Sequence, residues 1–308
     1  MPSRMGILQN CDTRLEERLE LHRLWLEHAP GGVRADLTGA VLSDLKLDNA
    51  NLREAILRET AFLDSNLCGA DLSGADLTNA DLRNANLLGA DLSGADLTNA
   101  NFQFAWLSEA NLSEARILNA RFEKANLRDC RVFEAQLRSV TFSGANLTGA
   151  CFNHCSIDNS SFTGADCTGT KFLHSRLHTC RFNQAHGVSA DFSSASAQDS
   201  DFSGVRFESA KFHRADLSRG SFIRASLIGC NFTGSNLSGA DFSLASLATS
   251  RFSGADFNAA NLSSAILEGA RELSAPQLGM ARTSNATTLP NGSKGPYVKN
   301  SGAERPKR

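Results

Sequence analysis

The chain has 308 residues, of which 41% are hydrophobic and 21% are charged, a balance that excludes a disordered chain and a membrane protein. Its formal net charge of −2 argues against a general nucleic-acid binder, whose surface would be strongly basic. No apolar run approaches the roughly 20 residues of a membrane span, and the first residues lack the apolar stretch of a signal peptide. We therefore expect a cytoplasmic protein that contacts neither membranes nor nucleic acids directly.

The first 34 residues predict a capping segment with a helix over residues 13–28. Thr13 and Glu16 have the spacing of a capping box, and Pro30 with the two glycines after it would stop the helix. The face expected to cover the end of the following segment consists of Leu21, Leu24, Trp25 and His28.

Residues 35–270 form a repeat with a period of five. Every fifth residue from Leu37 to Leu267 is here called a centre. There are 47 centres, of which 24 are Leu and 17 are Phe. Two residues before these centres, 31 of the 47 positions are Ala and most others are also small. No insertion breaks the register, so we expect one uniform architecture over the whole range.

Neither a helix nor a flat strand can use a period of five. Five helical residues turn through about 500°, which scatters the apolar positions around the helix, and an odd period sends successive strand centres to opposite faces. A coil that turns a corner every five residues points one large and one small residue inward on each side. Two residues after the centres the chain has 15 Gly and six Asn, which tolerate positive φ. The repeat therefore predicts stacked coils.

The tandem A(D/N)LXX units, continuous over residues 70–101, resemble those of the bacterial pentapeptide-repeat family. The resemblance covers residues 35–270 and implies a right-handed quadrilateral β-helix with four pentapeptides per coil. The 47 units would then give about 12 coils, and the strand spacing of ~4.8 Å a rod of about 55–60 Å. The predicted fold class is an all-β solenoid, capped by an N-terminal helix and a short C-terminal helix.

The centres sort into four columns, each of which takes every fourth pentapeptide, and Phe is concentrated in two of them. The column through Phe62 holds nine Phe and the column through Phe152 holds six, whereas the other two hold one each. Because Phe-rich and Leu-rich columns alternate around the coil, we expect Phe to face Phe across it.

One coil lacks large side chains in both Leu-rich columns, where Gly187 and Ala197 replace Leu. We expect an irregularity there, since an unfilled space of that size would be costly. Phe207 would lean into the gap, or a bulge would turn Val188 inward.

The C-terminal part falls into two segments. Residues 271–282 predict a closing helix, centred on "SAPQLGMA". Residues 283–308 are rich in Gly, Pro, Asn, Ser and Lys and predict a disordered tail.

Candidate catalytic and metal-binding chemistry is weak. Most cysteines occupy inward positions and behave as small apolar residues of a reduced protein. Cys151, His154 and Cys155 are close in sequence, with His174 one coil further, but Cys155 would point inward and the other two outward. We therefore predict no catalytic residue, no metal site and no cofactor, and we do not expect an enzyme.

The outward position before the centre carries an acidic group in the first half of the repeat: Asp71, Asp76, Asp81, Asp91 and Asp96. With four pentapeptides per coil, Asp71 would stack on Asp91 and Asp76 on Asp96, where like charges repel. These residues are candidates for an acidic partner-binding face. The alternative is that Asp suits the turn and that later Arg residues balance it.

A second surface candidate is aromatic. Phe104 and Trp106 lie off the inward positions and next to the acidic group. Trp is a common interface anchor, although an exposed aromatic pair can also simply cover a turn.

Two function classes compete. The first is a non-catalytic scaffold that presents outward side chains to an unidentified protein. The second follows from the resemblance, because some family members protect DNA gyrase from quinolones or peptide toxins by imitating a DNA duplex. Those acidic rods dimerise through their C-terminal ends, so gyrase binding and such a homodimer are the corresponding expectations. Residues 31–270 contain 26 acids and 20 bases. This small excess of negative charge is weak support for an imitation of DNA, so the scaffold is preferred.

Overall fold

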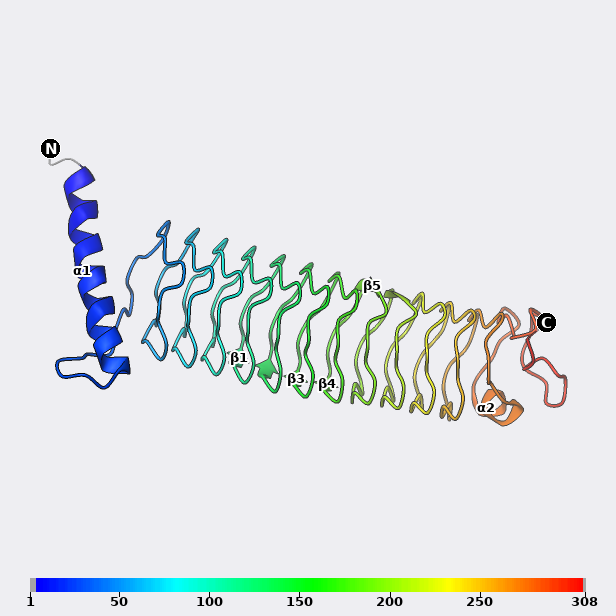
Figure 1. Ribbon diagram of the computed structural model, residues 1–308. Coiled ribbons are helices and arrows are strands. Elements are labelled where there is room, and N and C mark those ends of the chain that lie inside the picture. The colour runs from blue at the N-terminus through cyan, green and yellow to red at the C-terminus, as the bar shows by residue number, and fades with distance from the viewer. Residues whose placement is uncertain (1–3, 307–308) are drawn as a thin grey trace.

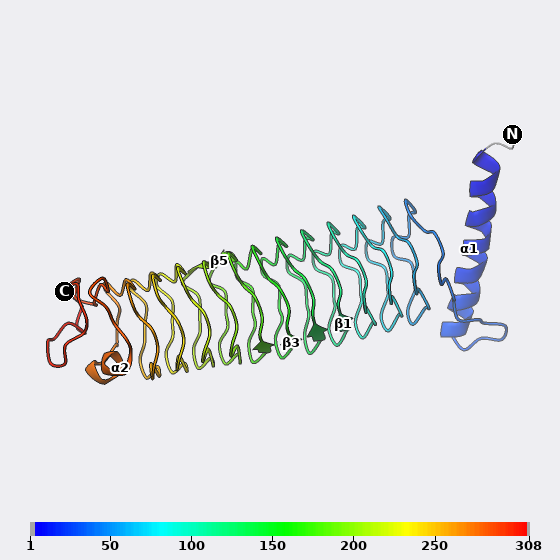
Figure 2. The same ribbon diagram turned by 180° about the vertical axis from the view of Figure 1, so that it is seen from behind.

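The computed structural model describes residues 4–306, which form a long rod of stacked coils with a helix at each end (Figure 1). Helix α1 (Arg4–Leu26) stands across the N-terminal end of the rod, and helix α2 (Ala275–Met280) lies near the other end. Seen from behind, the coils follow one another without interruption (Figure 2). No helix in the described range is both long enough and apolar enough to cross a bilayer.

Parallel pairing between successive turns of the chain defines the coil. The pairing begins with the bridge between Asp36 and Ile56, and up to the bridge between Arg251 and Arg271 it keeps this offset of 20 residues along all four sides. Each coil therefore contains four pentapeptides, as predicted. The regular strands are β1 (Arg116–Leu118), β2 (Gln136–Arg138), β3 (Ser156–Asp158), β4 (Arg176–His178), β5 (His186–Val188) and β6 (Arg206–Glu208). Strands β1 to β4 form one parallel sheet in this order, and β5 pairs with β6.

The centres and the small residues before them fill the interior of the rod. Phe142 is 1% exposed, and its ring stacks between those of Phe122 and Phe162 at centroid distances of 5.1 and 5.0 Å. It also meets Phe152 edge-on at 5.6 Å. The prediction that Phe faces Phe across the coil is therefore confirmed, and the rings add stacking along the rod to contacts across it.

The irregular coil is accommodated by the backbone and not by Val188. Gly187 has a φ of 152°, and a Cβ atom there would lie 2.5 Å from the backbone nitrogen of Thr168 in the preceding coil. The ring of Phe207 is buried and lies 5.8 Å from that of Phe192. Val188 is 48% exposed, so the prediction that it turns inward is wrong, because β5 keeps the regular register with β6.

Helix α1 begins earlier and packs through a different face than predicted. It starts at Arg4 and runs through Thr13, which is therefore not its N-cap. No proline interrupts residues 4–12, and a helix extends cooperatively once it has formed. The residues that pack on the first coil are spaced at four and three positions along one face: Leu15, Leu19 and His22.

The predicted face is only partly used. Leu21 and His28 are exposed, while Leu24 and Trp25 are half-buried. The four predicted residues lie beside the face that packs on the first coil. An offset of one or two positions along a helix moves a side chain to a different face.

The C-terminal end is closed by α2 and by the segment after it. Ser274 caps α2 in a capping box with Gln277, whose Nε2 donates to the carbonyl oxygens of Phe252 and Ala255, both at 2.8 Å. The helix predicted here is confirmed.

Residues 283–306 are folded, so the prediction of a disordered tail is wrong for them; residues 307–308 lie outside the described range. The amide of Leu267 donates to the carbonyl of Thr288 at 2.8 Å, and Thr288 pairs antiparallel with Lys294. Leu289 is 3% exposed. Composition suggested disorder, but the last coil has an open edge that this segment pairs with and covers.

Candidate interaction surface

The rod has four long faces, each defined by the outward residues that precede the centres. One of them, here called the Trp106 face, is defined by residues that bridge from coil to coil: Asn66, Asn86, Trp106, Asn126 and Asn146. The other three faces carry charged residues at the same position, among them the predicted aspartates.

The predicted acidic residues do not gather on a single face. Asp71 bridges to Asp91 on one face, and Asp76 bridges to Asp96 on the next, as expected for coils of four pentapeptides. Asp81 lies on a third face, where it bridges to an asparagine. Each of these three faces therefore holds only one or two of these carboxylates, and the Trp106 face holds none.

Each predicted aspartate also stabilises its own turn. The carboxylate of Asp71 accepts a hydrogen bond from the backbone N–H of Ser73 at 3.0 Å, and that of Asp91 from Ser93 at 2.9 Å. The same bond forms at Asp76, Asp81 and Asp96. This is the Asx-turn, which explains why the position favours Asp and Asn along the whole rod.

Arginines neutralise three of the five carboxylates: Asp76 pairs with Arg58, Asp81 with Arg83 and Asp96 with Arg116. Partial burial raises the pKa of Asp76, but hydrogen bonds from Thr78 and Arg58 outweigh it and hold that pKa below its usual value. The hydrogen bond from Arg83 lowers the pKa of Asp81. These carboxylates are engaged within the rod, which reduces what they can offer to a partner.

The two predicted aromatic residues are exposed but differ in setting. Phe104 is 47% exposed and occupies a corner with a φ of 61°, where the ammonium group of Lys124 lies 5.5 Å from its ring centroid. Trp106 is 60% exposed and lies on the flat part of its face, between Asn86 and Asn126. Trp106 is the larger apolar surface, and nothing in the described structure covers its indole ring.

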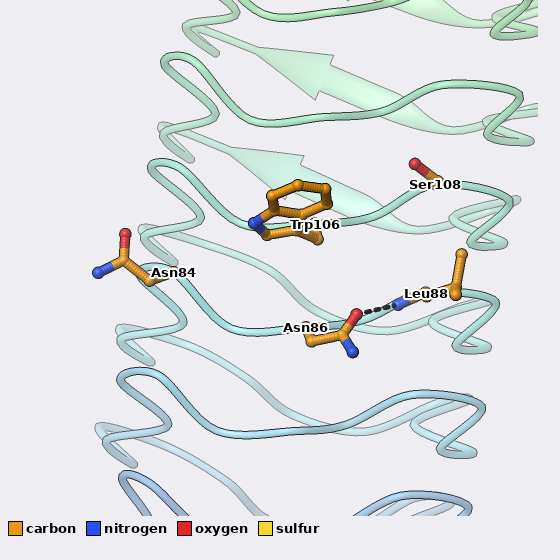
Figure 3. Close-up of a pocket in the computed structure, with 5 residues that line it drawn as sticks. All are labelled: Asn84, Asn86, Leu88, Trp106 and Ser108. Atoms are coloured by element: carbon orange, nitrogen blue, oxygen red, sulfur yellow. Dashed lines mark hydrogen bonds between the residues drawn. The ribbon is translucent and has the colours of Figure 1, made fainter.

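A shallow depression lies beside the indole (Figure 3). Its lining consists of Asn84, Asn86, Leu88, Trp106 and Ser108. The Leu88 side chain comes from the preceding coil and is 42% exposed. Leu88 was not predicted from the sequence, although an apolar residue directly after a centre stands out among the polar residues usual there.

The cysteine and histidine cluster does not form a metal site. Cys155 is buried, whereas His154 is exposed and stacks on His174 at 5.2 Å. Within the described range, no three His, Cys, Asp or Glu side chains converge as metal ligands. The Cys130 thiol donates to the carbonyl of Leu107, and burial raises its pKa to about 12, so it acts as an inert polar link inside the rod.

The sequence matches two profiles of one family. The profile described as pentapeptide repeats matches eight copies between residues 35–144 and 210–271, and the profile described as a pentapeptide repeat region matches residues 135–212. The chain belongs to the pentapeptide-repeat family. These matches span the whole solenoid and leave only the two capping ends outside.

Several solved proteins are similar to this chain, and the first two named here are pentapeptide-repeat proteins. HetL of the cyanobacterium Nostoc, involved in heterocyst differentiation regulation, is 25% identical, with a TM-score of 0.29 and coverage of 85% of this chain and 92% of HetL. Rfr23 of the cyanobacterium Cyanothece is 26% identical over 49% of this chain and 95% of its own, with a TM-score of 0.34. QnrB1, a plasmid-mediated fluoroquinolone resistance protein, is 21% identical over 78% and 83%, with a TM-score of 0.24. No curated protein sequence matches this chain.

Proposed function

We propose that this pentapeptide-repeat protein is a non-catalytic scaffold of the cytoplasm, which binds a protein partner through the Trp106 face. The observation that carries the proposal is an indole ring that is 60% exposed on a flat, rigid face, beside a shallow depression. Trp residues at such places are the usual anchors of protein interfaces. The packed interior of Leu, Phe and Ala holds the face rigid, so little ordering of the scaffold opposes binding.

The test is site-specific photo-crosslinking in cells that express the gene naturally. A photoreactive amino acid at Ser108, beside the indole, should capture a defined protein, and Trp106→Ala in the same chain should abolish that product. The matched control places the photoreactive amino acid at Ala248, which occupies the same position of its pentapeptide seven coils further along. Capture of the same proteins from both positions, or a product that survives Trp106→Ala, would contradict the proposal.

DNA mimicry is the second candidate, and the stacked carboxylates of Asp71 and Asp91 favour it, since neither forms an ion pair within the described structure. A duplex carries one negative charge per ≈ 1.7 Å of axis, far more than this face offers. A gyrase supercoiling assay with and without a quinolone decides this candidate. Protection that is lost in the double variant Asp71→Asn, Asp91→Asn would establish it, and an unchanged assay would exclude it.

A further inference from the structure

The Trp106 face differs from the other three faces in charge. Its defining residues are four asparagines and one tryptophan over five consecutive coils, without a single charge. At the strand spacing of ~4.8 Å, this neutral strip is about 20 Å long. Trp106 lies at its middle.

The side-chain oxygens of the four asparagines in the strip are already engaged. The Asn86 amide donates to Oδ1 of Asn66 at 2.9 Å, and its own oxygen accepts from the backbone N–H of Leu88 at 3.2 Å. The oxygens of Asn126 and Asn146 accept backbone N–H groups in the same way. The asparagine oxygens are therefore used within the rod, and the main feature that a partner can recognise is the apolar area of Trp106 and Leu88.

The backbone of the strip is also paired from coil to coil. The amide of Trp106 donates to the carbonyl of Ala85 at 2.9 Å, and its carbonyl accepts from the amide of Leu87 at 2.7 Å. An extended peptide that joins a sheet needs a free strand edge, and the pairing from coil to coil leaves none along this face. A partner must satisfy its own backbone, which a helix does.

Acidic residues border the strip on both sides. Asp44 and Asp64 occupy one bordering corner and Glu109 the other, and all three are exposed. Among the described residues none of the three forms an ion pair. Of the bases beside the strip, Lys124 lies over the Phe104 ring and Arg128 pairs with Asp129. Lys46, which continues the face beyond Asn66, is exposed and forms no ion pair among the described residues. The free charge at the two bordering corners is therefore negative.

We propose that the Trp106 face binds an amphipathic helix of the protein partner, whose apolar stripe is flanked by Lys and Arg. The stripe covers Trp106 and Leu88, and the flanking bases approach Asp64 and Glu109. About 13 helical residues span a strip of about 20 Å at 1.5 Å per residue. This inference rests on the proposed scaffold function and specifies the segment that the scaffold receives.

The probe is an 18-residue amphipathic helical peptide of Leu and Lys with a fluorescent label, and binding is followed by anisotropy. Two control peptides replace Lys by Glu or scramble the sequence. Only the Leu/Lys helix should bind, and Trp106→Ala and Leu88→Ser should each weaken it at least tenfold. The matched control is Ile228→Ser: Ile228 occupies the same position as Leu88 seven coils further along, and both side chains are 42% exposed. That variant should bind as the parent does.

The charged border is tested in the same assay. Asp64→Asn together with Glu109→Gln should weaken the Leu/Lys peptide and reduce its salt dependence, whereas Asp76→Asn should change neither. Equal binding of the Glu peptide, equal binding by Ile228→Ser and Leu88→Ser, or no binding of the Leu/Lys helix would overturn the inference.

The scaffold function itself is judged separately. If the product crosslinked at Ser108 persists in saturating Leu/Lys peptide, the partner occupies the face in another way and the helix inference alone fails. If no product forms at Ser108, the scaffold proposal fails first.

Discussion

At the residue scale, each central side chain is held by its own coil and by the coils above and below it. Phe142→Ala removes a ring that stacks on two other rings and meets a third, in an interior without room to collapse. We expect a loss of about 3–5 kcal/mol in the free energy of unfolding, measured by urea denaturation. An unchanged midpoint would contradict the inward placement of the centres.

At Gly187, in the irregular coil, adding a side-chain atom rather than removing one should destabilise the fold. Gly187→Ala cannot keep a φ of 152° without strain, and its methyl group would collide with the backbone near Thr168. We expect a loss of at least about 2 kcal/mol. The control is Gly144→Ala, at a corner with a φ of 66° and only Lys124 within reach, where the loss should be about 1 kcal/mol. Equal thermal shifts in both variants would refute the strained geometry at Gly187.

At the scale of the elements, His22 couples the docking of α1 to pH. The side chain is fully buried, its Nδ1 accepts the backbone N–H of Ala35 at 3.1 Å, and its ring stacks on Trp25. Burial lowers the pKa of His22 below its ordinary value of 6.5, and nearby Arg34 acts in the same direction, against the carbonyl of Arg53 and the carboxylate of Glu54. The docked helix thus requires the neutral imidazole.

It follows that α1 should loosen in acid. As the pH falls below 6.5, the undocked state binds a proton that the docked state excludes, so docking weakens until the pH reaches the lowered pKa. Trp25 fluorescence reports this in a Trp106→Phe chain, which retains a single tryptophan. The transition should disappear in His22→Gln. A transition that persists in His22→Gln would assign it to another group.

The elements also show what sequence could and could not predict. The register, the inward centres and the opposed Phe columns followed from the period of five, because one rule repeats at every coil. The start of α1 and the folded segment 283–306 did not, since each depends on what one end of the rod leaves uncovered. At the surface, the positions of Asp76 and Trp106 and the suitability of Asp for the turn were predictable, but the ion pair of Asp76 with Arg58 and the contribution of Leu88 needed the structure.

At the scale of the whole molecule, the two ends decide whether the rod remains a single particle. The segment 283–306 covers the edge of the last coil, where Leu267 and Gly269 donate to the carbonyls of Thr288 and Pro290. A chain that ends at residue 282 would leave these groups unpaired and expose an open strand edge. We expect it to self-associate in light scattering, more strongly than the full chain. Identical particle mass for both would show that the segment is not needed as a cover.

The fixed offset of four pentapeptides between paired residues means that length and orientation change separately in this molecule. Removing four consecutive pentapeptides from the solenoid removes one coil and shortens the rod, but every later side chain stays on the same face of the rod. Removing a single pentapeptide rotates everything downstream by a quarter of a revolution, so that residues beyond the deletion that had lain in line with Trp106 would point to a neighbouring side. An insertion or deletion of one to three pentapeptides thus rotates the later part of the rod about its axis. Natural variation in length should therefore come in whole coils of four pentapeptides wherever one face must stay continuous.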